Sequence, residues 1–321
     1  MNDWLLLSFE LFAGCQIDFV DACESVLKSY FTGINLLGFE IIGNRISSLF
    51  GDELVMGSYL SRLFPLLFAL FLIKPKLKFE IYFIGILFIL VDVLIFMSGE
   101  RTAFFFLNLS TVFIIILIKE YQKFRLVTFI IAIICIIILS LNSSNLTERM
   151  FVSPAKDMGL IKSSDQKTIF TPVHDSILKT AIKMFQDKPI FGHGPKMFRI
   201  KCADSKYSVG QKPCSTHPHN FYVQLLAETG IIGFLFLFSA LAYVIYTALR
   251  QFKSIIFKQK RPLTDYQVCL LAGILITIWP LTTNGNFFNN WLMIAYSLPV
   301  GFYLQSIYSK KSKNRNVKLF M

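Results

Sequence analysis

Two long apolar runs follow one another in residues 79–119, and they decide the class of fold. The stretch is FEIYFIGILFILVDVLIFMSGERTAFFFLNLSTVFIIILIK. A helix needs about 20 apolar residues to cross the hydrocarbon core of a bilayer. The runs 79–98 and 102–119 come close to that length, and only a few residues separate them. They predict two transmembrane helices joined by a tight turn.

Similar runs recur along the chain. Of its 321 residues, 54% are hydrophobic and 16% charged, with a mean hydropathy of +0.57. Soluble domains carry about a quarter charged residues, so a soluble, disordered or collagen-like chain is excluded. The sequence predicts an all-α, polytopic transmembrane helix bundle. It has seven clear spans, and an eighth run at 4–17 is short and contains Glu10. The seven spans are 54–73, 79–98, 102–119, 124–141, 220–248, 265–283 and 289–308.

Basic residues set the expected orientation. When the seven spans are threaded alternately, four basic clusters fall on one side, which the positive-inside rule makes cytoplasmic. They are Lys74/Lys76/Lys78, Lys119/Lys123/Arg125, the cluster from Arg250 to Arg261, and the tail from Lys310 to Lys318. These clusters hold half of the 32 Lys and Arg, so the net charge of +12 reflects topology. No nucleic-acid partner is expected.

The predicted organisation has five parts. A marginal N-terminal segment with an interfacial helix covers 1–53, a four-helix transmembrane half covers 54–141, and an outer loop covers 142–219. A three-helix transmembrane half follows at 220–308, with a basic cytoplasmic tail at 309–321. The loop is too long to be an idle connection. It holds all four histidines, and Thr171-Pro172 opens a predicted amphipathic helix in it.

His219 is the strongest candidate for chemistry. Thr216 or His217 can cap a helix whose first turn contains Pro218, which would place His219 in the first turn of a membrane helix. The positive end of the helix dipole disfavours imidazolium, so His219 is expected to be neutral and available as a base. The alternative is a histidine that only helps to cap the helix.

Several cations are candidates for binding an anion. Arg101, in the turn 98–101, could offer its fork to a phosphate or could be a snorkelling anchor. The glycine-rich turn 192–199 presents Lys196 and Arg199, and its backbone donors suit anions, although an ordinary turn is the alternative. Arg45 and Arg62 flank the outer start of the span 54–73.

Other polar residues fit less specific roles. Neither HExxH nor CxxC spacing accompanies the histidines, so no metal site is predicted. Cys202 and Cys214 lie in the outer loop and could form a disulfide where the compartment is oxidising. Asp92 and Glu228 lie inside predicted spans, and Glu228 is expected to be a buried structural partner.

Taken together, these residues resemble the O-antigen ligase/polymerase family of bacterial envelope glycan enzymes. The family's ligase signature, His-[Asn/Ser/Gln]-X9-Gly-X-X-Gly, is matched by His219, Asn220, Gly230 and Gly233. Three other stretches look like the same family: Gly192–Arg199, Arg45 to Arg62, and Ser98–Arg101. The resemblance covers roughly residues 44–305. The family usually has further spans before the Arg45 region, so the chain is expected to be N-terminally short.

The resemblance implies a glycosyltransferase of the GT-C type in the bacterial inner membrane, active at the periplasmic face without metal or cofactor. The donor would be a glycan on undecaprenyl diphosphate, and the acceptor lipid A core or another lipid-linked glycan. His219 would deprotonate the acceptor, and Arg101 and Arg199 would stabilise the departing diphosphate. Substrate-binding residues would be Arg45, Arg62, Lys196, His217 and Asn220.

The sequence leaves two choices open. Ligase and polymerase differ only in the acceptor, and nothing in the chain distinguishes them. A transporter or flippase of lipid-linked glycan is the competing hypothesis, although the chain lacks the internal repeats and paired broken helices that it would favour. A third interpretation is an envelope scaffold, in which His219 would be replaceable.

Overall fold

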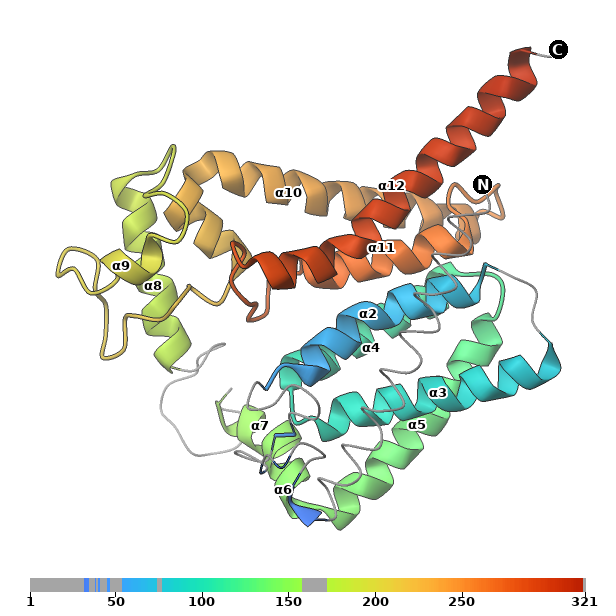
Figure 1. The fold of residues 1–321 in the computed structure, drawn as a ribbon, viewed down its shortest axis with the longest axis horizontal. Coiled ribbons are helices and arrows are strands. Elements are labelled where there is room, and N and C mark those ends of the chain that lie inside the picture. The colour runs from blue at the N-terminus through green and yellow to red at the C-terminus, as the bar shows by residue number, and fades with distance from the viewer. Residues whose placement is uncertain are drawn as a thin grey trace. The chain divides into compact units, whose positions relative to one another are not determined.

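The structure is a computed structural model that describes residues 32–34, 38, 40, 45–46, 54–73, 77–157 and 172–319. In this part of the chain every regular element is a helix, and an isolated bridge pairs Ile34 with Glu40 (Figure 1). The all-α prediction is therefore confirmed. The run at 4–17 and most of the predicted N-terminal segment 1–53, with its interfacial helix, lie outside the described residues.

The chain divides into two compact units. Unit 1 comprises Met1–Met150, Ala248–Ile276 and Leu298–Met321; unit 2 comprises Phe151–Thr247 and Thr277–Ser297.

Unit 1 contains four helices that correspond to the first four predicted spans. They are α2 (Met56–Phe71), α3 (Lys78–Met97), α4 (Arg101–Leu117) and α5 (Gln122–Asn142). Helix α3 packs along α5, and α2 packs along α4. A short helix α6 (Ser144–Thr147) and a π-helical turn (Glu148–Val152) follow. The unit also contains the end of α10 (Phe221–Ile256), nearly all of α11 (Asp265–Thr277) and most of α12 (Asn290–Leu319).

Three of these helices are long and apolar enough to cross a membrane, namely α3, α5 and α10; α2, α4 and α11 are shorter apolar helices. The chain is therefore a membrane protein by the composition of its helices. Helix α11 ends at Thr277, whereas the sequence predicts a span to residue 283. Proline at 280 lacks a backbone N–H and disfavours helical geometry at the residue before it, which explains the early end.

A buried ion pair joins the helices of unit 1. The Arg125 guanidinium donates to both carboxylate oxygens of Asp92, at 2.8 and 2.9 Å, and to Thr111 Oγ1 at 2.8 Å. Arg125 and Asp92 are at most 1% exposed, and Arg125 lies over the ring of Phe64. The positive-inside rule assigns Arg125 to a cytoplasmic basic cluster. The membrane side of this cluster stays a prediction, but Arg125 is not a loop residue, because α5 begins at Gln122 and carries it between α3 and α4.

Two predicted cytoplasmic loops meet at one end of unit 1. The Asp265 carboxylate accepts the backbone N–H groups of Lys119 and Glu120, at 2.6 to 3.0 Å. The Leu117 carbonyl accepts from Gln251 at 3.3 Å and from Arg261 at 3.2 Å. The α4–α5 turn and the α10–α11 connection therefore lie on the same side of this unit, as alternate threading requires.

Unit 2 is built from the rest of the chain. It contains α7 (Ser153–Asp157), α8 (Pro172–Asp187), α9 (Phe198–Lys201) and α10 as far as Thr247. Helix α8 starts at the predicted Pro172 and is amphipathic. Its apolar face, with Ile177 and Met184, packs on Phe198 and Tyr207 in a small core. The predicted helix is thus confirmed.

Candidate functional site

A kink at Gly230 divides α10 and organises unit 2. Gly230 has φ 67° and ψ −163°, a backbone conformation essentially reserved for glycine. A Cβ there would lie 2.2 Å from the carbonyl oxygen of Ile190. Gly233 is needed for a related reason, because its Cβ would lie 2.7 Å from the Cβ of Thr229. Both glycines of the ligase-type motif therefore serve the kink and its packing.

The loop before α9 docks into this kink by backbone hydrogen bonds. Ile231 N–H donates to the Pro189 carbonyl at 2.8 Å, so the Ala227 carbonyl is available to the loop and accepts from His193 N–H at 3.0 Å. The Glu228 carbonyl accepts from Gly194 N–H at 2.8 Å. The glycine-rich pattern predicts that the backbone N–H groups of this turn bind an anion. For His193 and Gly194 that interpretation is wrong, because α10 already uses both N–H groups.

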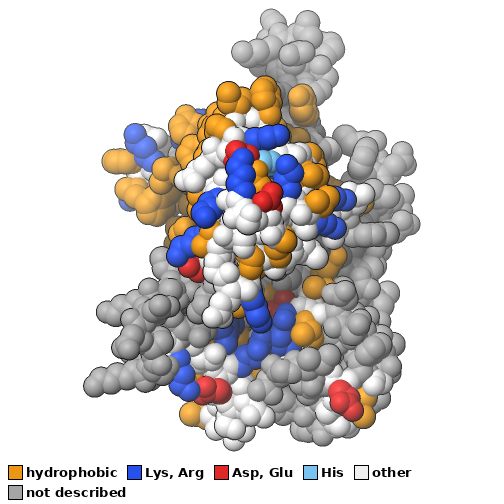
Figure 2. All heavy atoms as spheres, turned by 90° about the vertical axis from the view of Figure 1, so that its left-hand side faces the viewer, with side chains coloured by type: hydrophobic (Ala, Val, Ile, Leu, Met, Phe, Trp, Pro, Cys, Tyr) orange, Lys and Arg blue, Asp and Glu red, His pale blue; other side chains and the backbone are white. Residues whose placement is uncertain are grey.

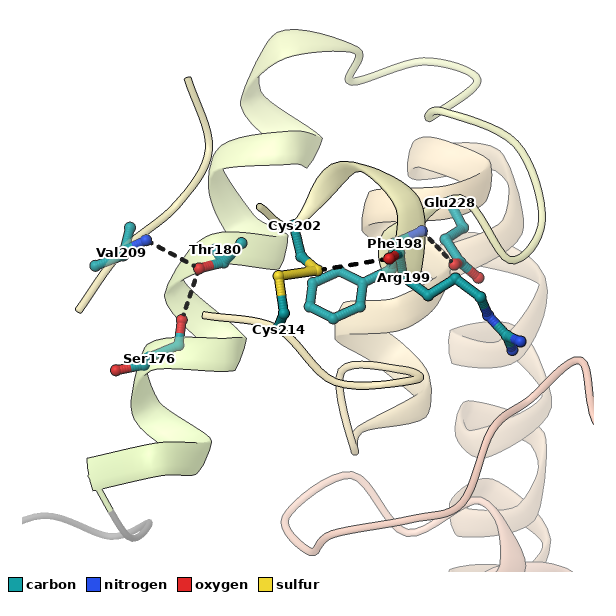
Figure 3. The surroundings of a disulfide bond; sticks show 8 residues. All are labelled: Ser176, Thr180, Phe198, Arg199, Cys202, Val209, Cys214 and Glu228. Carbon is teal, nitrogen blue, oxygen red and sulfur yellow. Dashed lines mark hydrogen bonds between the residues drawn. A yellow bond between two sulfur atoms is a disulfide. The ribbon is translucent and has the colours of Figure 1, made fainter. Parts of the chain in front are cut away.

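Glu228 is buried where the loop and α9 pack against α10. Its carboxylate accepts from Phe198 N–H at 2.9 Å and from Gln224 Nε2 at 2.9 Å, and the residue is 1% exposed (Figure 3). Gln224 continues the network to Asn286 Oδ1 at 2.7 Å. Glu228 therefore fixes the start of α9 on α10, which is the structural role that the sequence predicts.

His219 lies just before α10, and not in its first turn. Its φ is 58°, the left-handed region, and the helix begins at Phe221. Asn220 is the helix cap, since its Oδ1 accepts from the N–H groups of Tyr222 and Val223 at 3.0 and 3.1 Å. The predicted cap at Thr216 or His217 is thus wrong. Asn has the short acceptor side chain that helix N-caps favour, and it leaves His219 outside the helix.

The segment 277–297 holds the backbone of His219 in place. The His219 carbonyl accepts from Asn284 N–H at 2.7 Å, and Asn220 Nδ2 donates to the Pro280 carbonyl at 2.7 Å. His217 bonds through Nε2 to the Asn284 carbonyl at 3.2 Å and through Nδ1 to Thr216 Oγ1 at 2.9 Å. Because a carbonyl can only accept, His217 carries its proton on Nε2. Both of its nitrogens are then occupied.

The ring of His219 lies in a small histidine cluster and contacts Ser215. Nε2 is 2.9 Å from Ser215 Oγ, and the ring centroid is 4.2 Å from that of His217 and 5.2 Å from that of His174. Burial, followed by the neighbouring His217 and His174, lowers the pKa of His219 to about 4. Burial also lowers the pKa of His217 and of His174. His219 is therefore a neutral base near pH 7.

A disulfide between Cys202 and Cys214 ties the chain before Ser215 to the end of α9 (Figure 3). The pairing that the sequence allows is thus present. Arg199 is exposed, on the α9 turn between Phe198 and Cys202, and its charge contributes to the lowered pKa of His217. Unit 2 therefore brings the predicted Arg199, His217, His219 and Asn220 together. Lys196 is exposed, with φ 62°.

A second cluster, rich in arginine, lies in unit 1 at the turn between α3 and α4. The Glu100 carboxylate caps the start of α2, accepting from Gly57 N–H at 2.7 Å and from the Ser58 hydroxyl at 2.7 Å. A Cβ on Gly57 would lie 2.5 Å from Ser98 Oγ, so the contact requires glycine. Two of the stretches that carry the family resemblance therefore touch each other here.

Three guanidinium groups surround this turn. Arg101 Nε donates to the Arg149 carbonyl at 2.8 Å, and Arg149 Nε donates to the Gly99 carbonyl at 2.8 Å. Arg45 lies 3.8 Å from the Glu100 carboxylate and also donates to the Leu54 carbonyl. Burial and the charges of Arg45 and Arg101 lower the pKa of Arg149, whereas burial raises the pKa of Glu100. The cluster has a net positive charge.

Arg62 has a different position from the other predicted arginines. It is 4% exposed, donates to the Ser58 carbonyl at 3.2 Å, and lies 4.6 Å over the ring of Phe106. These contacts place its guanidinium between α2 and α4. A substrate contact for Arg62 stays a prediction.

Sequence reasoning missed Arg149, Ser215 and His174. Arg149 follows the apolar run of α5 as an isolated cation, and Ser215 is one of many serines. His174 is 45 positions from His219, and only the packing of α8 brings the two rings together. Within the described residues, no group of three or more His, Cys, Asp and Glu side chains forms a metal site.

Fold and sites together define a helical membrane protein with a neutral histidine cluster in one unit and an arginine cluster in the other. Residues 84–238 match the family model described as O-antigen ligase. This match supports membership of the O-antigen ligase/polymerase family and, with it, an enzyme of lipopolysaccharide biosynthesis. Comparisons with curated proteins and with solved structures found no match.

Proposed function

We propose that the chain is a membrane glycosyltransferase that transfers or polymerises a glycan carried on undecaprenyl diphosphate. The acceptor is lipid A core for a ligase or a second lipid-linked glycan for a polymerase. The observation that carries the proposal is the position of His219, neutral and hydrogen-bonded to Ser215 at the start of α10, within the matched O-antigen ligase region.

His219 acts as the general base in this proposal. Its neutral ring takes the proton from an acceptor hydroxyl, whose oxygen bonds to the anomeric carbon of the donor. The bond from that carbon to the diphosphate oxygen breaks, and the lipid diphosphate leaves with the electron pair. A bound diphosphate would raise the pKa of His219, because a nearby anion favours imidazolium, and the base would strengthen when the donor is present.

Ser215 sets which nitrogen of His219 is the base. After proton transfer both ring nitrogens carry hydrogen, so the Ser215 oxygen must then accept from Nε2. A serine that already accepts from Nε2–H in the resting enzyme leaves the lone pair on Nδ1. We assign the base to Nδ1 on this ground, with Ser215 stabilising the imidazolium as the orienting partner of a catalytic histidine does.

Arginines stabilise the leaving diphosphate. Arg101 and Arg199 take this role, with Arg45 and Arg149 adding charge, since guanidinium forks match phosphate oxygens and act where charge develops. Lys196 is an exposed candidate for contact with the glycan. His217 and Asn220 were predicted to bind substrate. Their polar groups are hydrogen-bonded within unit 2, so we propose that they position the His219 loop.

The proposed topology has seven spans in the bacterial inner membrane, with the basic loops in the cytoplasm and both clusters at the periplasmic face. Alkaline phosphatase fused after Gly210 should be active, and the same fusion after Lys258 should be inactive. Activity after Lys258 would invert the orientation and remove the clusters from the periplasm.

Glycolipid gels of cells lacking this gene test the reaction. Core with a single repeat indicates a polymerase, and bare core with accumulated lipid-linked polymer indicates a ligase. Wild type should restore the pattern and His219→Ala should not, at equal abundance in the membrane fraction. The exposed Lys212→Ala is the matched control. Full restoration by His219→Ala would contradict the mechanism and favour a transporter or scaffold.

The role of Ser215 has its own test. Ser215→Ala should reduce transfer, and Ser215→Thr, which keeps the hydroxyl, should restore it. With only four histidines in the chain, nitrogen NMR of histidine-labelled protein can assign the tautomer of His219. Protonation of Nδ1 in the resting enzyme would refute the assignment.

A further inference from the structure

The part of α10 that can lie in hydrocarbon begins at the Gly230 kink. Residues 231–249 contain no charged side chain, and Arg250 ends this run. At 1.5 Å per residue the run is about 28 Å long, close to the roughly 30 Å hydrocarbon core of a bilayer. The first part of α10, with the buried Glu228, then lies outside the hydrocarbon. The kink marks the boundary.

The loop between α8 and α9, which is hydrogen-bonded to α10, exposes two large apolar side chains at this boundary. Ile190 and Phe191 are 57% and 75% exposed, although the backbone on both sides of them is bonded to α10. The Ile190 carbonyl oxygen and the Phe191 nitrogen lie 2.2 and 2.7 Å from the position that a Cβ on Gly230 would take. Hydrogen bonds from Ile231 to Pro189 and from His193 to Ala227 prevent the loop from turning these side chains inward.

The exposed pair lies where the loop contacts α10, and the residues of α10 that follow this contact also expose apolar side chains. Ile232 and Phe236 follow the kink in α10 and are 52% and 75% exposed. They belong to the uncharged run 231–249, whose length fits the hydrocarbon core. The exposed Lys188 precedes the pair. Figure 2 shows hydrophobic side chains beside Lys and Arg on the face that carries α8 and α9. Apolar anchors next to a basic residue are typical of segments that lie in the membrane interface.

We propose that Ile190 and Phe191 insert into the interface of the outer leaflet and hold the unit 2 loop on the bilayer at the Gly230 kink. The partner is a lipid surface, because the loop contacts α10 at Gly230, where the uncharged run that fits the hydrocarbon begins, and because the basic Lys188 precedes the apolar pair. Lys188 would contact lipid phosphates. This proposal rests on α10 being a membrane span and does not depend on the glycosyltransferase reaction.

Tryptophan fluorescence tests the insertion in the full-length protein. Phe191→Trp, Phe236→Trp and Lys212→Trp are made separately, purified and reconstituted in phosphatidylcholine vesicles. The emission of the wild-type protein, which contains three tryptophans, is subtracted. All three positions are exposed, so the substitutions leave the core unchanged.

Lipid brominated near the headgroup should quench Trp at 191 most strongly. Lipid brominated near the chain end should quench Trp at 236 more strongly than Trp at 191, and aqueous iodide should quench only Trp at 212. Iodide quenching of Trp at 191 to the extent seen at 212 would overturn the proposal. Protection of Trp at 191 from both bromine and iodide would also overturn it, and would indicate a protein on this surface.

Discussion

Gly230→Ala is expected to separate the 189–194 loop from α10. The new methyl group would have to occupy the space held by the Ile190 carbonyl, 2.2 Å away, and this obstacle is backbone, so no side-chain rotation can remove it. Alanine also disfavours φ 67° with ψ −163°. The substituted chain can relieve both problems only by straightening the helix or releasing the loop.

The cost follows from these terms. An alanine held in a glycine-only conformation costs roughly 1–3 kcal/mol. Releasing the loop also breaks the three backbone bonds made by Ile231, His193 and Gly194, each contributing about 1 kcal/mol. Because releasing the loop also relieves the strain, the two costs are alternatives, and we expect a loss of about 3 kcal/mol in the free energy of unfolding. That is a large part of the 5–15 kcal/mol typical of folded proteins.

Thermal melts of purified protein in detergent, together with the glycolipid gel, measure the effect. Gly301→Ala is the matched control, because a Cβ at Gly301 would meet nothing within 4 Å. Gly192→Ala should resemble Gly230→Ala, since its Cβ would lie 2.4 Å from the Glu228 carbonyl carbon across the same interface. Melting and activity of Gly230→Ala equal to those of Gly301→Ala would refute the explanation of the kink.

Three further outcomes follow from the structure. Asp92→Asn leaves the buried Arg125 without its counter-charge and should lower the free energy of unfolding by about 3–5 kcal/mol. A double variant, Asp92→Leu with Arg125→Leu, removes both charges and should have a melting temperature closer to that of wild type. Equal melting temperatures for the two variants would contradict this account. At limiting donor, transfer should be lost as the pH falls through about 4, the pKa of His219 in the donor-free enzyme, and at saturating donor the loss should come at a higher pH. In the unfolded chain His219 titrates near 6.5, so between pH 6.5 and 4 the unfolded state binds a proton that the folded state does not, and acidification through this range should lower stability. Activity assays and thermal melts from pH 8 to 3.5 test both expectations. Replacing Cys202 and Cys214 by alanine should cost about 3 kcal/mol and reduce transfer by loosening Ser215, and reductant should reproduce this in wild type only.

Local sequence patterns predicted many of the helices. The starts of α2 to α5 lie within two residues of the predicted spans, because an apolar run in lipid must satisfy its backbone hydrogen bonds internally and so forms a helix. Pro172 likewise predicted the start of α8. Both involve neighbours in sequence, which is why they could be predicted.

The errors involve partners that are far apart in the chain. Arg125 was assigned to a loop because the sequence cannot show that Asp92, 33 positions earlier, faces it inside the bundle. The donors of His193 and Gly194 were offered to an anion because the α10 kink that uses them lies more than 30 positions later. The role of a polar group depends on its hydrogen-bond or ion-pair partner, and the tertiary structure decides which residue that partner is.

The sequence by itself determined the helical membrane class, the expected side of the basic loops and the His219, Asn220, Gly230 and Gly233 spacing. Only the tertiary structure decided what that spacing does. Asn220 caps the helix, Gly230 kinks it, the loop before α9 bonds to the kink, and the segment after α11 bonds to the backbone of His219. Hydrophobicity and helix-ending chemistry act over a few residues, so they are visible in one dimension. The neutral state of His219 comes from burial among residues of α8 and of its own loop, and burial exists only once the chain has folded.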